Sequence, residues 1–382
     1  ALIVAMSLFG VLSIFAATAD PVSVQPSTIM EMIQTQPTQY ANLQMLWLLA
    51  GLFMMAVMLY FDYELYGKYA NVIYWANIAL LFVVLFMERG QGNMAGWFYW
   101  GANATRTIQP SEFGKIAIII ALARLFASRS KPITRVAELL PVLAYIGLPL
   151  LLIAAQPDYG TAMVYIVVFG VMLFASGTSS RILIGMVSIA VLALVGVWQW
   201  MSMAEDSGFR TNRIMVFIDQ TSDLQGAGMQ TYNARLAVGS GGLWGKGLFT
   251  PGSIASLNFI PFDHTDFVFA IVCETFGFVG AGLLVLGYVV LLVRMIIMSS
   301  QAADAFGAYT IIGIVAMMLF HVFENIAMVI GLMPVTGIPL PFISYGGSNL
   351  LTNFMAMGVV LNVSMRSKEK RTRPTLAPAA RL

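Results

Sequence analysis

Residues 266–298 read DFVFAIVCETFGFVGAGLLVLGYVVLLVRMIIM, an apolar run whose charged residues are Asp266, Glu274 and Arg294. About 20 consecutive apolar residues are enough for a helix to cross the hydrocarbon core of a bilayer. The run therefore predicts a long transmembrane helix. Glycines inside it, such as Gly277, predict that this helix tilts or bends.

The composition of the whole chain agrees with this interpretation. Of 382 residues, 59% are hydrophobic and only 10% are charged, whereas a soluble domain carries about 25% charged residues. A soluble globular enzyme, a disordered protein and a nucleic-acid-binding module are thereby excluded. The single cysteine, Cys273, cannot close an internal disulfide. His264 and His321 lie too far apart in sequence to suggest a zinc site.

Nine further apolar stretches resemble the first. We predict an all-α polytopic membrane protein of about ten transmembrane helices, in which residues 1–365 form a single transmembrane domain. The ten predicted spans are 1–19, 43–61, 69–87, 112–128, 139–156, 161–177, 182–203, 266–298, 305–332 and 349–365.

The distribution of lysine and arginine predicts the orientation of the chain. The tail 366–382 holds six basic residues, and the short connection around 124–135 holds four. Cytoplasmic loops carry an excess of basic residues. We therefore expect both termini, including the basic tail, to be cytoplasmic. The large loop 204–265, between the seventh and eighth spans, is then extracellular.

Charges within or at the ends of membrane helices are costly, which makes each a candidate functional residue. In the predicted topology Glu112, Lys115, Asp158 and Asp266 all lie near the outer ends of their helices. They are expected to converge on one outward-facing polar cavity. The alternative for the first three is a structural ion pair of Lys115 with Glu112 or Asp158.

Asp266 closes the stretch IPFDHTD and begins the quoted apolar run. One interpretation is an acid that stabilises a helix N-terminus through the macrodipole. The other is a carboxylate at the boundary of membrane and water that acts as a general base on a lipid-borne substrate.

Three other stretches allow two interpretations each. The glycine run 239–247 lacks the spacing of a Walker phosphate loop, so Lys246 and bare amides would either meet a phosphate or form a surface turn. Residues 333–348 hold three prolines and three glycines, and they form either a rigid segment that shapes a site or a stiff connector. The aromatic cluster 97–100 either marks the membrane interface or stacks on a sugar.

Five sequence blocks occur together in a characteristic order. They are QPSEF with Lys115 (109–115), QPD with GT (156–161), AVGSGG (237–242), HTDF (264–267) and the run 331–348. In this combination the chain resembles the SEDS family of peptidoglycan glycosyltransferases. Residues 245–247 and 325–331 are most similar to its RodA branch, with the FtsW and SpoVE branches close.

The resemblance implies an enzyme of the bacterial cytoplasmic membrane with an outward-facing active site. It would polymerise lipid II, an undecaprenyl-pyrophosphate disaccharide-pentapeptide, into β-1,4 glycan strands for cell elongation and shape. The implied partners are a class B penicillin-binding protein and other membrane proteins of the elongation complex, with no nucleic acid. The alternatives are a lipid II flippase and a division or sporulation paralogue.

The resemblance also implies roles for single residues. Asp266 matches the essential aspartate and would accept the proton of the acceptor 4-hydroxyl. The family tryptophan matches Trp97, with Trp100 as the alternative. No cofactor is firmly implied, and a divalent cation (Mg or Mn) at the pyrophosphate is the one candidate. The predicted substrate-binding residues are Trp97, Glu112, Lys115, Asp158, Arg210, Arg213, Lys246, His264, Thr265 and Ser344.

Overall fold

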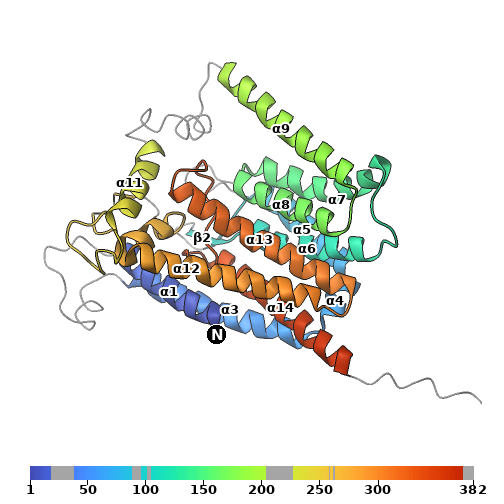
Figure 1. Ribbon diagram of the computed structural model, residues 1–382, viewed down its shortest axis with the longest axis horizontal. Coiled ribbons are helices and arrows are strands. Elements are labelled where there is room, and N and C mark those ends of the chain that lie inside the picture. Colours follow the sequence, from blue (N-terminus) through green and yellow to red (C-terminus); the bar gives the residue numbers. More distant parts are fainter. Residues whose placement is uncertain are drawn as a thin grey trace, which may run out of the picture.

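The structure is a computed structural model that describes residues 1–18, 38–87, 96–100, 105–203, 227–257, 259–260 and 263–372. It is a bundle of long helices (Figure 1). The elements are α1 (Leu2–Ala17), α3 (Gln39–Tyr60), α4 (Tyr63–Lys68), α5 (Ala70–Leu85), β1 (Phe98–Trp100), β2 (Thr105–Ile108), α6 (Pro110–Ala127), α7 (Val136–Ala155), α8 (Tyr159–Ala175), α9 (Ser180–Met203), α11 (Ala227–Ser240), α12 (Val268–Ser300), α13 (Ala305–Val329) and α14 (Gly347–Thr372).

Each of the ten predicted spans coincides with a helix, namely α1, α3, α5 to α9 and α12 to α14. Four of them, α3, α7, α12 and α13, are long and apolar enough to cross a membrane. Large apolar side chains such as Phe53, Phe82 and Leu283 are exposed on the bundle. Such a surface is typical of a protein surrounded by lipid. The chain is therefore a polytopic membrane protein, and the number of crossings stays a prediction.

The described residues form the predicted all-α bundle, with one small two-stranded addition. Strands β1 and β2 form an antiparallel hairpin in which Phe98 pairs with Ile108 and Trp100 with Thr105. Two short helices, α4 and α11, were also not predicted, because neither carries an apolar run of membrane length. The hairpin leads directly into α6, and β2 packs against α14.

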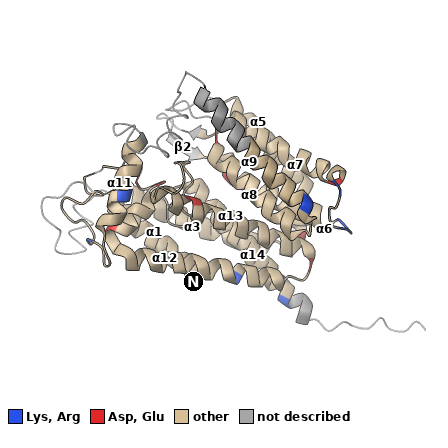
Figure 2. Cartoon of the chain, turned by 45° about the horizontal axis from the view of Figure 1, so that its top comes forward, with Lys and Arg blue, Asp and Glu red and all other residues tan. Residues whose placement is uncertain are grey.

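Helices α6 and α13 form the centre of the bundle. Most residues of α6 are buried, and α13 packs against α6, α8 and α12. Charged residues are sparse along the long helices and lie mostly toward their ends (Figure 2). The two ends of the bundle carry different residues. The Asp266 end holds the starts of α6, α8, α12 and α14. The basic end holds the connections 128–135, 176–179 and 301–304, with exposed Lys131 and Arg135.

The predicted bend of the apolar run 266–298 is confirmed. Helix α12 breaks at Gly277, whose φ of 66° and ψ of −168° are not helical. A glycine adopts such a backbone without steric cost. The run 241–247 packs into this break. The amides of Lys246 and Gly247 donate to the carbonyls of Glu274 and Thr275 at 2.8 and 3.0 Å, and the loop thereby replaces bonds that the broken helix has lost.

The close approach at this break predicts a difference between two neighbouring glycines. A Cβ on Gly241 would lie 2.0 Å from the carbonyl oxygen of Cys273, whereas a Cβ on Gly239 would meet nothing within 4 Å. We expect Gly241→Ala to destabilise the protein by roughly 1–3 kcal/mol through overpacking, and Gly239→Ala to leave stability unchanged or slightly raised. The thermal unfolding midpoint in detergent measures both. Equal midpoints for the two variants would contradict this packing.

Candidate active site

Asp266 lies in the turn 263–267 that precedes α12, and its side chain is partly exposed. Its main-chain carbonyl accepts a hydrogen bond from the Nδ2 of Asn325 at 2.8 Å. The same Nδ2 donates to the carbonyl of Ile338, also at 2.8 Å. Asn325 is fully buried on α13. One amide group therefore holds the start of α12 and the segment 331–346 in register, and we call this pair of bonds the Asn325 clamp.

The segment 331–346 runs directly beside the Asp266 carboxylate. A Cβ added to Gly337, which has φ +78°, would lie 3.5 Å from Asp266 Oδ2. The segment is fixed from several sides, because the Thr336 hydroxyl donates to the buried Glu324 carboxylate and Gln44 Nε2 donates to the Ser344 carbonyl at 3.1 Å. Its proline-rich sequence thus forms an anchored wall next to a carboxylate.

Ser344 serves the turn within this wall. Its hydroxyl oxygen accepts a hydrogen bond from the Leu340 amide at 2.8 Å, and the side chain is buried. Ser344 therefore shapes the segment through this bond.

Three aromatic rings lie beside the same turn. The His264 ring is 4.7 Å from the Tyr40 ring and 5.6 Å from the Tyr345 ring, measured between centroids. The Tyr345 amide also donates to the His264 carbonyl at 2.9 Å. Thr265, between His264 and Asp266, is partly exposed. Tyr40 and Tyr345 were not among the predicted residues, because only the fold brings 40 and 345 to His264.

Asp263 contacts both the ring and the main-chain amide of His264. Its Oδ1 lies 3.2 Å from His264 Nδ1 and accepts the His264 amide at 2.7 Å. Burial raises the pKa of the Asp263 carboxyl, and the hydrogen bonds from His264 act in the opposite direction. A buried carboxylate that bonds one ring nitrogen orients an imidazole.

The predicted acid and base residues form two groups. Lys115 Nζ lies 2.6 Å from Glu112 Oε1 and 3.1 Å from His321 Nε2, and Asn349 Nδ2 donates to Glu112 Oε2 at 3.2 Å. Glu112 and Lys115 are only 4% and 2% exposed. Of the two predicted ion pairs, the structure therefore contains Lys115 with Glu112. His321 and Asn349 belong to this buried network and were not predicted.

Asp158 forms the second group. It caps α8 by accepting the Thr161 amide at 3.1 Å. Its Oδ2 also accepts Gln109 Nε2 at 2.8 Å and the Ser111 hydroxyl at 3.3 Å. Asp158 thus ties the start of α8 to the start of α6, and it does not pair with Lys115.

Trp97 directly precedes β1 and is partly exposed. The adjacent Gly96 approaches Gln156, since a Cβ at Gly96 would lie 3.0 Å from Gln156 Oε1. The Trp97 segment therefore lies next to the connection between α7 and α8, and this connection contains Asp158. The alternative tryptophan, Trp100, ends β1, but its side chain falls outside the described residues.

Part of the run 239–247 is engaged within the protein. The amides of 245, 246 and 247 donate to Gly241, Glu274 and Thr275. Lys246 Nζ lies 2.6 Å from Glu274 Oε1, and Glu274 also accepts the amides of Ile254 and Ala255 at 2.9 and 3.0 Å. The ammonium group is therefore already neutralised in the α12 break, although its side chain stays 29% exposed.

Arg210 and Arg213, the other predicted pyrophosphate ligands, lie outside the described residues. Within the described ranges, no group of three or more His, Cys, Asp and Glu side chains is arranged to hold a metal ion.

Helix α13 joins the two halves of the site. His321 contacts Lys115, Asn325 clamps the start of α12, and these residues are four positions apart, so they lie on one face of the helix. Glu324 on the neighbouring position interacts electrostatically with Asp266. The arrangement is one partly exposed carboxylate held at a helix start by a dense, buried polar frame.

A family sequence model described as "Cell cycle protein", covering FtsW, RodA and SpoVE, matches residues 2–369. The chain is 36% identical over 330 residues to the stage V sporulation protein E of Bacillus subtilis strain 168, which covers 86% of this chain and 88% of that protein. It is 35% identical over 318 residues to the peptidoglycan glycosyltransferase MrdB of Escherichia coli K12, with 83% and 84% covered.

Solved structures show the same fold. A chain of a peptidoglycan synthase complex that coordinates polymerization and crosslinking matches with a TM-score of 0.77 at 26% identity, covering 96% of each chain. The rod shape determining protein RodA of Thermus thermophilus matches with a TM-score of 0.67 at 25% identity, covering 96% of this chain and 95% of that one. Sequence and fold agree over nearly the whole chain, which therefore belongs to the FtsW, RodA and SpoVE family, the SEDS family.

Proposed function

We propose that the chain is a peptidoglycan glycosyltransferase that polymerises lipid II into β-1,4 glycan strands on the outer face of the bacterial cytoplasmic membrane. The names of relatives that match at 33% and 35% identity, FtsW and MrdB, support this activity. The observation that carries the proposal is the partly exposed Asp266, whose main chain the Asn325 clamp holds. The basic end of the bundle then faces the cytoplasm.

In the proposed reaction, Asp266 accepts the proton of the acceptor sugar 4-hydroxyl. The hydroxyl oxygen attacks the anomeric carbon of the donor sugar, and the bond to the undecaprenyl pyrophosphate breaks, with its electron pair leaving on the pyrophosphate. Attack from the opposite face converts the α-linked donor into a β-1,4 product. Because the pyrophosphate is already a good leaving anion, a single base is sufficient.

The buried network has a positioning role in this proposal. Lys115 is 2% exposed and paired with Glu112, so it holds α6 against α13 through His321 and does not reach a pyrophosphate. Trp97 and the rings of His264, Tyr40 and Tyr345 are the groups on which the sugars would stack. Thr265 offers a hydroxyl beside them.

We further propose a class B penicillin-binding protein as partner and a role in elongation, with division and sporulation as the alternatives. The matching peptidoglycan synthase complex, described as coordinating polymerization and crosslinking, supports a crosslinking partner. A lipid II flippase would need a polar route through both leaflets. A polymerisation assay that starts from lipid II in detergent needs no transport. It therefore separates a polymerase from a flippase.

The base assignment predicts the behaviour of Asp266→Asn. We expect correctly folded Asp266→Asn protein to lose polymerisation of purified lipid II by 100-fold or more, since general-base catalysis contributes about 10²–10⁴ in rate. Gel separation of the glycan products measures the rate. The control is Glu138→Gln, which changes a partly exposed carboxylate in the first turn of α7, at the basic end of the bundle, and should retain activity. Chain growth at the wild-type rate by Asp266→Asn would remove Asp266 from this role.

The Asn325 clamp predicts a second kinetic effect. Asn325→Leu keeps the branching of the side chain at Cγ but removes both hydrogen bonds, so the carboxylate shifts relative to the segment 331–346. A displacement of about 1 Å can cost up to roughly 100-fold in rate. We expect kcat to fall about 10-fold or more, with a smaller change in KM.

The matched control is Asn362→Leu. Asn362 is a buried asparagine on α14 whose Nδ2 donates to the Met58 carbonyl at 2.7 Å, remote from Asp266. This variant should lower the thermal midpoint while leaving kcat of the folded protein unchanged. If the two variants lose stability and kcat in the same proportion, the clamp is only structural.

A further inference from the structure

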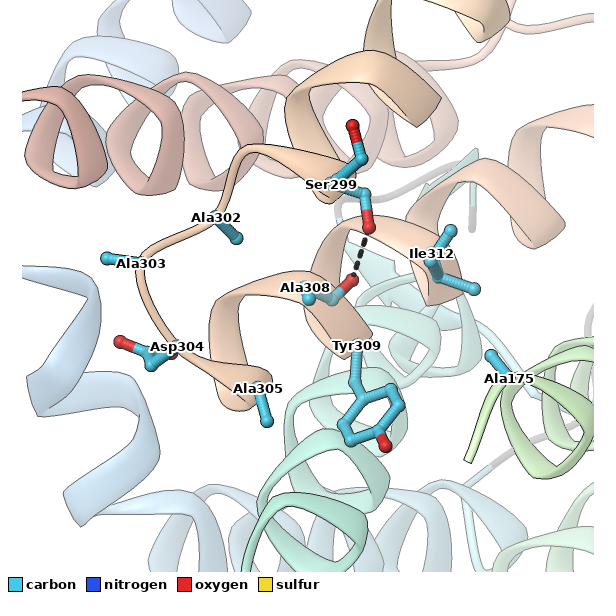
Figure 3. A pocket seen from close by; sticks show the side chains of 10 residues that line it. Ala175, Ser299, Ala302, Ala303, Asp304, Ala305, Ala308, Tyr309 and Ile312 are labelled. Atoms are coloured by element: carbon cyan, nitrogen blue, oxygen red, sulfur yellow. Dashed lines mark hydrogen bonds between the residues drawn. The ribbon is translucent and has the colours of Figure 1, made fainter. Parts of the chain in front are cut away.

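Two adjoining cavities lie at the basic end of the bundle, opposite the site around Asp266. The larger has a volume of about 490 Å³ and lies between the end of α12, the turn 301–304 and the end of α8 (Figure 3). The smaller has a volume of about 210 Å³ and is bordered by the connection 129–133. Tyr309 lines both cavities, so the two are parts of one depression.

The smaller cavity is basic. Arg129 and Lys131 line it together with Ser130 and Tyr309, and no acidic residue is part of its lining. Among the described residues, neither cation makes an ion pair within 4 Å, although Glu138 interacts with Arg129 at longer range. A guanidinium group binds phosphate oxygens bidentately, and an ammonium adds a point charge. The lining therefore suits a phosphate group.

The walls of this cavity are held in place. The Tyr309 ring packs edge to face on Phe126, with 6.2 Å between ring centroids. The Ser179 amide donates to the Ile133 carbonyl at 2.9 Å, which ties the connection 129–133 to the end of α8. The two cations thus project from a loop with a defined position.

The larger cavity offers a different environment. Its lining combines the apolar residues Ala175, Ala305, Ala308 and Ile312 with the polar residues Ser299 and Ser300. Asp304 is its acidic residue, and that carboxylate already caps α13, since it accepts the Gly307 amide at 2.8 Å and the Tyr63 hydroxyl. Its charge is therefore committed to the helix start. A larger cavity of mixed polar and apolar lining therefore adjoins the small basic cavity.

We propose that this depression binds the phosphate headgroup of an anionic phospholipid from the inner leaflet, with Arg129, Lys131 and the Tyr309 hydroxyl on the phosphate. Basic pockets between helices on the cytoplasmic side of membrane proteins bind such headgroups. The polar glycerol lies in the larger cavity near Ser299 and Ser300, and the first acyl carbons lie along Ala305, Ala308 and Ile312. The site depends on the orientation given by the basic loops, but it does not depend on the role of Asp266.

The experiment is a lipid titration of the full chain, purified in detergent and observed by native mass spectrometry. Phosphatidylglycerol and phosphatidylcholine with the same acyl chains are the two probes. We expect tighter binding of phosphatidylglycerol. The double variant Arg129→Gln with Lys131→Gln should weaken it by roughly 10- to 30-fold, because each cation near an anionic lipid contributes a several-fold factor. Tyr309→Phe, which keeps the ring, should weaken it about 2- to 10-fold.

The matched control removes the same charge from the same end of the bundle, at the last turn of α6 and at the residue before α7. Arg124 and Arg135 are exposed and do not line the cavities, so Arg124→Gln with Arg135→Gln should change binding less than 3-fold. Equal weakening by both double variants would overturn the proposal, because it would indicate diffuse electrostatic attraction. Displacement of the lipid by millimolar inorganic phosphate, with equal binding of the two lipids, would overturn the lipid assignment in favour of a soluble phosphate. Polymerisation of lipid II by the cavity variant is expected to be unchanged and reports its fold.

Discussion

A main-chain amide or carbonyl that lies outside a regular helix finds no water in the hydrocarbon region of a bilayer, and this constraint organises the whole bundle. Each irregular segment near the site meets a protein partner. The break of α12 at Gly277 is filled by the run 241–247. The proline-rich segment 331–346 gives its carbonyls to Asn325 and Gln44. The rigid surroundings of Asp266 follow from this requirement, because the bonds that satisfy the backbone also fix the start of α12.

The same principle applies to the charges inside the bundle. A buried ion is tolerated only when it is paired and its remaining hydrogen-bonding positions are occupied. Lys115 meets both Glu112 and His321, and Glu274 meets Lys246 and two loop amides. These charged groups are therefore engaged in contacts that hold the helices and their connections together. The carboxylates of Glu112 and Glu274 are buried, whereas Asp266 is partly exposed at the start of its helix, which is why the proposed chemistry is assigned to it.

The sequence predicted the helices well because apolar runs of membrane length are a strong signal, and all ten coincide with helices. It also predicted the ion pair of Lys115 with Glu112, because three positions on a helix bring side chains together. The partners of that pair, His321 and Asn349, come from α13 and α14, and no local pattern links them to Lys115. The hydrogen bonds of the amides of 245–247 could not be predicted for a related reason. Only the break of α12, which lies some thirty residues further along the chain, shows where those amides donate.

The central claim is that one carboxylate, fixed by the packing of α12, α13 and the segment 331–346, removes the proton of the attacking hydroxyl. The most direct test is the single-turnover rate of pyrophosphate-lipid release by folded Asp266→Ala protein, with and without added formate. The account predicts almost no release without formate and a rate that rises with formate concentration, because a small carboxylate then enters the vacated space. Release at the wild-type rate in the absence of formate would contradict it.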